Sequence, residues 1–142
     1  MQDRRFFFAM ASAAVGATMA PGGTPGAQAA IGAAVKTGGK AEKLEHTFGV
    51  QHIYYQGPTN ELSVFEGGSL RLKPGMEPHP PHKHPEEEIM LVTEGGGEIY
   101  VQGEVTQVGP GSMMYTNANE LHGIKCTGAE PLLFYYFKWL KS

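Results

Sequence analysis

The 142-residue chain has very little cysteine and, beyond its first few residues, very little arginine. Its one thiol, Cys126, cannot form a disulfide within the chain, so the fold has to be held by a hydrophobic core or by a metal. We interpret Cys126 as a small apolar side chain in a strand. Arg71 is the only arginine after residue 5, the formal net charge is -3, and no basic cluster is present. Proteins that bind nucleic acid normally carry many basic contacts to phosphate, so this sequence argues against nucleic acid as a partner.

The chain also lacks an apolar run long enough to cross a bilayer, which takes roughly 20 residues. The longest such run extends only from Phe6 to Met19 and follows Arg4 and Arg5. Small residues come next, and Ala27-Gln28-Ala29 has the A-x-A form that signal peptidase cleaves. We therefore predict that residues 1–29 are a cleaved signal peptide and that the mature protein is periplasmic or secreted, without stable membrane insertion.

The paired arginines followed by Phe6-Phe7-Phe8 resemble the twin-arginine export signal. That pathway carries folded proteins, often with their cofactor in place. Asp3 departs from the pattern, because Ser or Thr is usual at that position. The general secretory route and a retained N-terminal anchor remain the alternatives.

Residues 30–43 are rich in Gly and Ala and have no periodic apolar face, so we expect a flexible N-terminal segment. Residues 44–142 are predicted to form one domain. They show no helical period and no fixed repeat, and short apolar runs alternate with Gly, Pro and Asn. This spacing predicts an all-β sandwich or barrel with strands at 47–55, 61–73, 86–93, 97–102, 104–108, 112–116, 121–126 and 131–139.

The last predicted strand, 131–139, reads PLLFYYFKW and is apolar on both faces. A strand with two buried faces lies between two layers of one molecule or between the core and another subunit. A homodimer is therefore one interpretation, and burial within the monomer is the other.

The segment most informative about chemistry is GMEPHPPHKHPEEEIMLVTEG, residues 75–95. His82 and His84 are two residues apart, so on an extended chain they point to one face, and Glu88 shares their parity. Two imidazoles and a carboxylate on one face suit a first-row divalent metal. His122, far along the chain, is the candidate for a further imidazole folded back onto this site.

These residues resemble the two motifs of the cupin superfamily. The first motif matches at Gly75, His82-x-His84, Glu88 and Gly95, and the second at Gly103, Pro110-Gly111 and His122. The resemblance extends over roughly residues 62–138. It implies a single double-stranded β-helix, or jelly-roll, barrel with His82, His84, Glu88 and His122 as metal ligands.

The chain departs from the family pattern in both motifs, and in the first one six residues, not five, separate Gly75 from His82. Ser112 stands where an acidic residue is usual, residues 116–119 replace the usual proline, and Cys126 replaces the usual Asn. These changes affect loop geometry more than ligation. The remaining histidines, His46, His52 and His79, are expected to have ordinary structural roles.

Three imidazoles and one carboxylate leave about two open positions on an octahedral ion, for a bidentate ligand or for a substrate and O₂. Fe, Mn, Ni and Zn all fit such a set. The resemblance implies a metal-dependent enzyme on a small molecule, dioxygenase-like by preference, with Glu88 as its catalytic base. A non-catalytic metal- or ligand-binding barrel and a cupin isomerase or lyase are the alternatives.

The neighbouring side chains add further expectations. Glu86 and Glu87 are expected to face solvent or to support the ligands. Arg71 is expected to be a solvated strand residue and, as the alternative, a clamp for a substrate carboxylate. The candidates for an apolar pocket inside the barrel are Tyr54, Met90, Val92, Met113, Tyr115, Phe134 and Tyr136.

Overall fold

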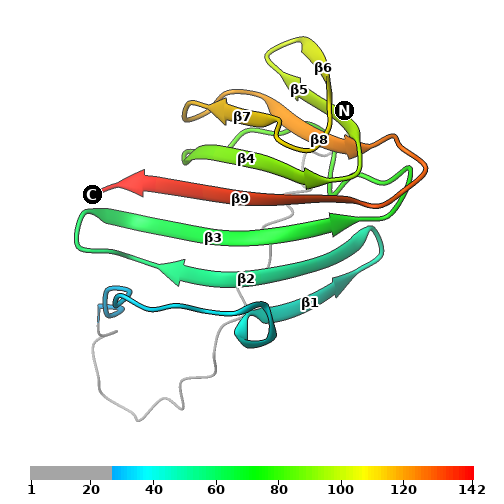
Figure 1. Cartoon of the computed structure of the whole chain (residues 1–142). Helices are drawn as coiled ribbons and strands as arrows, with labels where there is room; N and C mark the ends of the chain where they lie inside the picture. The colour runs from blue at the N-terminus through cyan, green and yellow to red at the C-terminus, as the bar shows by residue number, and fades with distance from the viewer. Residues whose placement is uncertain (1–26) are drawn as a thin grey trace, which may run out of the picture.

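The computed structural model describes residues 27–142, which form two antiparallel sheets (Figure 1). A short 3-10 helix, Gly38–Lys40, precedes the first strand. The strands are β1 (Glu42–His46), β2 (Gly49–Gly57), β3 (Leu62–Leu72), β4 (Glu87–Glu94), β5 (Gly97–Val101), β6 (Glu104–Val108), β7 (Met113–Thr116), β8 (His122–Cys126) and β9 (Leu132–Lys141). The larger sheet has the order β1-β2-β3-β9-β4-β7 and the smaller sheet the order β6-β5-β8.

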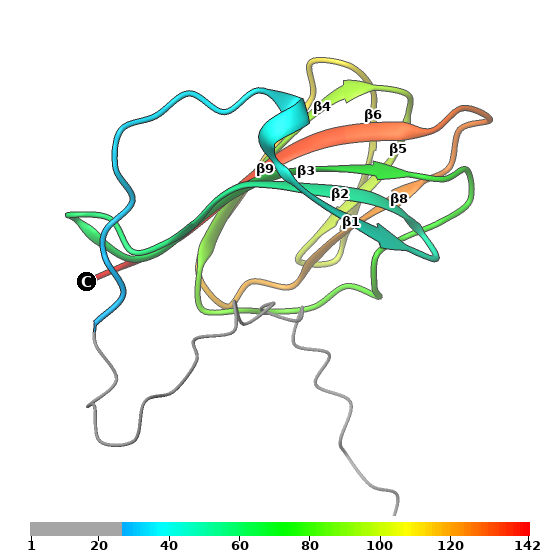
Figure 2. The same ribbon diagram turned by 90° about the horizontal axis from the view of Figure 1, so that it is seen from below.

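The two sheets pack face to face, and Figure 2 shows the smaller sheet crossing beneath the larger one. Their inner faces enclose one hydrophobic core, to which both sheets contribute. Its buried members are Leu70, Leu72, Met90, Val92, Ile99, Met114, Ile124, Cys126, Leu132, Phe134 and Tyr136. The predicted all-β jelly-roll fold is confirmed, and Cys126 is a buried core side chain, as predicted.

Strict alternation along β4 fixes which of its residues reach the interior. Glu88, Met90 and Val92 are buried, whereas the residues between them are only partly buried. A strand with a period of two turns every second side chain to the same face. Glu88 therefore enters the barrel on the same face as two core side chains.

Strand β9 lies at the centre of the larger sheet, between β3 and β4. Leu132, Phe134 and Tyr136 are buried on its inner face. The intervening residues lie on the outer face, where Phe137 is 40% exposed. The apolar side chains of β9 thus lie alternately in the core of the monomer and on the outer face of the sheet.

The eight predicted strands correspond to β2 through β9, with each end within two residues of the prediction. Strand β1 was not predicted. Its sequence, EKLEH, is mostly charged and carries no apolar alternation, because β1 is an edge strand with exposed side chains.

The predicted flexible segment 30–43 includes the short helix and the start of β1, and it contacts the barrel. The backbone N–H of Ile31 donates to the Pro58 carbonyl at 2.8 Å, and the Tyr55 hydroxyl donates to the Ala34 carbonyl at 2.6 Å. Of the predicted signal peptide 1–29, only residues 27–29 lie within the described residues. Over residues 27–142, no helix is both long and apolar enough to cross a membrane.

Candidate metal centre

The loop between β3 and β4 carries His82 and His84 and runs along β8. The backbones of Met76 and Cys126 are joined by a 2.9 Å hydrogen bond. Further along, His82 and His122 exchange both backbone hydrogen bonds, at 2.9 and 3.0 Å, and form an isolated antiparallel bridge. Residues 80, 81 and 85 are prolines, which cannot donate backbone hydrogen bonds, so pairing with β8 is confined to a few positions. This bridge places two histidines that are 40 residues apart in the sequence side by side.

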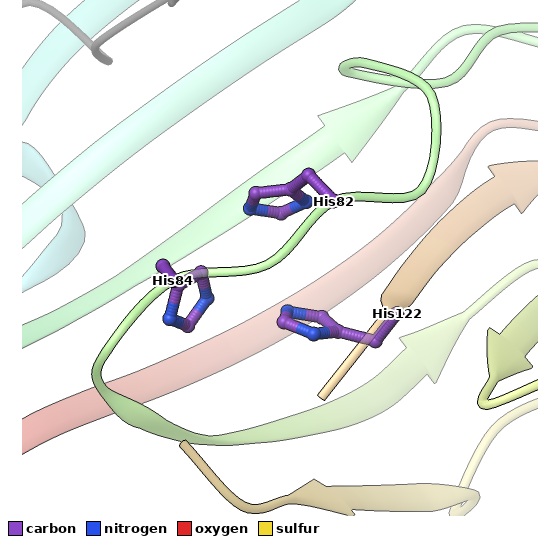
Figure 3. A group of neighbouring side chains, drawn as sticks. All are labelled: His82, His84 and His122. Atoms are coloured by element: carbon purple, nitrogen blue, oxygen red, sulfur yellow. The ribbon is translucent and has the colours of Figure 1, made fainter. Parts of the chain in front are cut away.

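The three histidines converge inside the barrel mouth (Figure 3). Their rings come from the loop before β4 and from the first residue of β8. The ring centroids of His84 and His122 are 4.8 Å apart, and those of His82 and His122 are 4.9 Å apart. One nitrogen from each of the three rings lies within 4.8 Å of the others, a grouping that can hold a metal ion.

Glu88, the second residue of β4, completes the cluster. Its Oε2 lies 2.8 Å from Nε2 of His84 and 2.9 Å from Nε2 of His122. Two ligands at right angles, each about 2.1 Å from one ion, would be about 3.0 Å apart. The predicted residues His82, His84, Glu88 and His122 are therefore brought together, with three of them at spacings that suit a shared cation.

In His122 and His84, the ring nitrogen that faces away from Glu88 is hydrogen-bonded to a backbone carbonyl, and this contact indicates which nitrogen carries the proton. Nδ1 of His122 lies 2.8 Å from the Glu120 carbonyl, and Nδ1 of His84 lies 3.1 Å from the Glu86 carbonyl. A carbonyl oxygen only accepts, so Nδ1 carries the proton in both rings. Nε2 of each ring faces the Glu88 carboxylate, as the donor of a protonated imidazolium or, in the neutral ring, as a lone pair that a bound cation would take up in place of the proton.

His82 is held differently. Its Nδ1 is buried and has no hydrogen-bond partner among the described residues. Its ring packs edge-on against His79 at a centroid distance of 3.9 Å. Burial, together with the neighbouring imidazoles, lowers the pKa of His82 to about 4. The ring is therefore neutral at ordinary pH, and an orphaned buried nitrogen beside two other imidazoles fits a metal ligand.

The charge states of Glu88 and His122 depend on each other. Burial opposes the charge on Glu88, but hydrogen bonds with His122 and His84 outweigh it and lower the pKa of Glu88 to about 2. Burial lowers the pKa of His122, yet the hydrogen bonds to Glu88 and to the Glu120 carbonyl give a net rise. An ionised carboxylate among imidazoles is the charge pattern of a divalent-metal site.

The three consecutive glutamates have three different surroundings. Glu88 points inward to the histidines. Oε2 of Glu86 lies 3.1 Å from Nδ1 of His84, on the side away from Glu88. Glu87 points to the outer face, where it accepts hydrogen bonds from the Trp139 indole and the Tyr115 hydroxyl, both at 2.7 Å. These positions agree with the sequence interpretation, which set Glu88 apart from its two neighbours.

Among the pocket candidates, Met90, Val92, Phe134 and Tyr136 are buried as predicted. The prediction was wrong for Met113 and Tyr115, which are 66% and 50% exposed. In β7 the buried alternate residues are Met114 and Thr116, so the parity is opposite to the one assumed.

Tyr54 is the third departure from the predicted pocket. A β-bulge between Ile53 and Tyr55 shifts the register of β2, and Tyr54 lies on the outer face near Tyr135, with ring centroids 6.4 Å apart. Arg71 is also on this face, paired with Glu94 at 2.7 Å. It is a solvated strand residue and does not reach the histidines.

Two charged side chains near the cluster, one buried and one partly buried, were not predicted from the sequence. Glu66 is 7% exposed, and the Lys138 side chain is 17% exposed. Lys138 pairs across the sheet with both Glu66 and Glu88. Parity along β3 and β9 was the available signal, since Glu66 shares the face of Leu70 and Lys138 shares the face of Tyr136.

Two hollows on the described residues lie on the outer faces of the sheets. One, about 320 Å³, is on the outer face of β2, β3 and β9. The other, about 170 Å³, is on the outer face of the smaller sheet. Core side chains occupy much of the space between the two sheets.

The comparisons with known proteins agree with this geometry. The profile of the cupin domain family matches residues 68–137. KdgF from Halomonas sp. is similar in structure, with a TM-score of 0.63 and 16% identity, over 75% of this chain and 94% of that one.

Two further solved structures show the same likeness. An RmlC-like cupin from Shewanella frigidimarina gives a TM-score of 0.62 and 17% identity, over 73% and 87% of the two chains. A predicted oxalate decarboxylase from Thermotoga maritima gives 0.59 and 22%, over 75% and 99%. No curated protein matches the sequence significantly. At these identities the structural likeness establishes the fold, and the activity has to be argued from the site.

Proposed function

We propose that this cupin barrel is an exported metal-dependent enzyme that acts on a small molecule, with His82, His84, Glu88 and His122 as ligands of one divalent first-row metal. The observation that carries the proposal is the pair of 2.8 and 2.9 Å contacts from Glu88 Oε2 to two imidazole Nε2 atoms whose Nδ1 protons are already committed. A bound metal would supply Lewis acidity at its open positions. Fe, Mn, Ni and Zn all remain candidates.

Dioxygenase chemistry is the first reaction class to test. The four-residue set leaves about two positions on an octahedral ion, which suits a substrate together with O₂. Isomerisation and lyase chemistry use the same open positions and form the second part of the screen. Glu88, as an ionised carboxylate in the cluster, is the proposed proton acceptor.

A non-catalytic binding barrel is the alternative function. The buried core side chains on the inner faces of both sheets favour it, because they take up interior volume that a substrate would otherwise occupy. The two functions make different predictions for turnover and the same prediction for metal content.

The deciding experiment is metal analysis of the exported, purified protein, followed by an O₂-uptake and product screen over catechols, flavonols and diketones with each metal. The proposal expects about one metal per chain and turnover with at least one metal. One metal per chain without turnover would favour the binding barrel. Protein that retains no first-row metal after loading and dialysis would overturn both functions.

A further inference from the structure

Two of the three clustered histidines are oriented by hydrogen bonds, and the third is not. Nδ1 of His84 and Nδ1 of His122 each contact a backbone carbonyl oxygen, at 3.1 and 2.8 Å. Contacts of this kind fix the tautomer and the ring orientation of metal-binding histidines. Nδ1 of His82 is buried and has no hydrogen-bond partner within residues 27–142. The orientation of the His82 ring therefore has to come from another contact.

His79 supplies such a contact. Its ring packs edge-on against the His82 ring, with the centroids 3.9 Å apart and an interplanar angle of 69°. The His82 ring also contacts the rings of His84 and His122, at centroid distances of 5.1 and 4.9 Å (Figure 3). Those two rings are proposed metal ligands themselves. Among the ring contacts of His82 in the described part of the chain, the closest is thus the one from outside the ligand set.

The His79 ring is itself held by the segment on which it lies. Its Nδ1 is 3.0 Å from the Pro80 carbonyl oxygen, which can only accept, so Nδ1 donates this hydrogen bond. The chain bends over residues 78–81. Pro80 and Pro81 fix φ at two positions of this bend, and His79 is restricted as well because it precedes a proline. An imidazole anchored on a stiff bend can hold a neighbouring ring in place.

The same segment is docked firmly on β8. A Cβ at Gly123 would lie only 3.2 Å from Cα of Pro81, so the glycine permits this close approach. The next residue, His82, exchanges both backbone hydrogen bonds with His122. The backbone of His82 is therefore fixed relative to β8. What remains free is rotation of the His82 side chain, and the His79 ring packs against that side chain.

We propose that His79 is a positioning residue of the metal centre: its ring, packed on His82, orients that imidazole toward the metal in place of the carbonyl contacts that orient His84 and His122. This inference rests on the proposed function, because it assumes that His82 is a metal ligand. His79 acts through the shape of its ring and does not bind the metal. An aromatic ring without nitrogen should therefore serve equally well, whereas loss of the ring should let His82 adopt other rotamers.

The test compares His79→Ala, which removes the ring, with His79→Phe, which keeps an aromatic ring. His52→Ala is the matched control, because His52 lies on β2 beside the outer hollow. Zn(II) affinity is measured by competition with a chelator, and the visible absorption of the Co(II)-loaded protein reports the ligand geometry. His79→Ala is expected to bind Zn(II) about tenfold more weakly and to change the Co(II) spectrum. His79→Phe and His52→Ala are expected to match the wild type in both measurements.

Three results would overturn the proposal. The first is the same Zn(II) affinity in the wild type and His79→Ala. The second is an equal loss in His79→Ala and His79→Phe, because an imidazole nitrogen would then be required, as in a direct ligand. The third is a lower thermal stability of His79→Ala with an unchanged Co(II) spectrum, which would show a role in stability alone.

Metal-free protein separates this inference from the proposed function. Wild-type protein that binds neither Zn(II) nor Co(II) would contradict the proposed function. The ring of His82 can still be observed by NMR of histidine-labelled protein at one fixed pH. A single ordered set of His82 ring resonances is expected in the wild type and His79→Phe, and rotamer-averaged resonances are expected in His79→Ala. The same ordered His82 resonances in His79→Ala would overturn the positioning role.

Discussion

The backbones of His82 and His122 hydrogen-bond to each other in both directions, at 2.9 and 3.0 Å. The bridge fixes the relative positions of two imidazoles independently of any ligand between them. Pre-positioned ligands lower the conformational cost of binding a metal. Loss of either side chain should therefore remove a ligand without removing the backbone geometry.

We predict that His82→Ala or His122→Ala loses most of the bound metal, whereas His46→Ala does not. Structural metal sites contribute about 10 kcal/mol or more, so losing one of four ligands should cost several kcal/mol of affinity. His46 is a suitable control because it stacks on Phe48 at a centroid distance of 4.6 Å, in β1, away from the cluster. Metal content is measured on each purified variant. Equal occupancy in all three variants would contradict the assignment.

The sequence predicted the site better than it predicted the rest of the barrel interior. His82, His84 and Glu88 are close in the sequence and share a parity, so local geometry sufficed for them. His122 was proposed as the distant imidazole that a barrel could fold back onto the site, and the family resemblance supported it, because no local pattern specifies which distant strand returns. The missed residues, Glu66 and Lys138, are charged, and composition alone suggests a solvated surface for charged residues.

The wrong assignments in the predicted pocket arose because the sequence of one strand does not specify which of its faces is buried. Met113 and Tyr115 are apolar or aromatic, and we assigned them to the interior, although β7 is only four residues long and either parity was available. Burial of Met114 and Thr116 on the inner face decided the parity. The bulge near Tyr54 likewise depends on pairing with β3, which no single strand's sequence specifies.

Glu87→Ala should lower stability without changing metal content. Glu87 accepts hydrogen bonds from the Trp139 indole and the Tyr115 hydroxyl on the outer face. Hydrogen bonds to a charged group contribute about 1.5–3 kcal/mol when buried, but Tyr115 is half exposed, so a loss of about 1 kcal/mol is expected. Urea unfolding and metal analysis measure the two quantities. A loss of metal comparable to that in His122→Ala would contradict the assignment of Glu87 to the outer face, away from the metal ligands.

A homodimer, one interpretation of the apolar last strand, would use the outer face of β9, β4 and β7. Met113, Tyr115 and Phe137 are exposed there, at 66%, 50% and 40%. A contiguous apolar patch of this kind marks an interaction site more often than chance. Met113→Glu should then convert a dimer to a monomer in light scattering coupled to size exclusion. Val105→Glu, on the smaller sheet and 59% exposed, is the matched control and should have no effect. A monomeric wild type would remove this interpretation.

Export and cleavage are tested by the N-terminus of protein recovered from the periplasm. Cleavage after Ala29 predicts a mature chain that begins at Ala30. Membrane-bound protein that still begins at Met1 would contradict it. Replacing Arg4 and Arg5 together with Lys should stop export if the twin-arginine route is used. Unchanged export of that variant would favour the general secretory route instead.

The last prediction concerns the role of Glu88 in chemistry. Gln at residue 88 keeps the size and one oxygen of the side chain but removes the charge and most of the basicity. The imidazole nitrogens of His84 and His122 would then face a neutral group where they now contact a carboxylate oxygen. We expect Glu88→Gln to fold, to bind metal more weakly, and to lose turnover per bound metal by about 10²-fold or more if Glu88 acts as a general base.

Glu86→Gln is the neighbouring control for this experiment. Glu86 contacts the Nδ1 side of His84 at 3.1 Å and so supports a ligand without entering the cluster. Its loss should lower metal affinity modestly, about tenfold, and leave turnover per bound metal close to that of the wild type. Activity normalised to metal content separates the two variants. A binding barrel would show the same order of metal affinities with no turnover to lose, whereas a silent Glu88→Gln beside a damaging Glu86→Gln would place the functional carboxylate at residue 86.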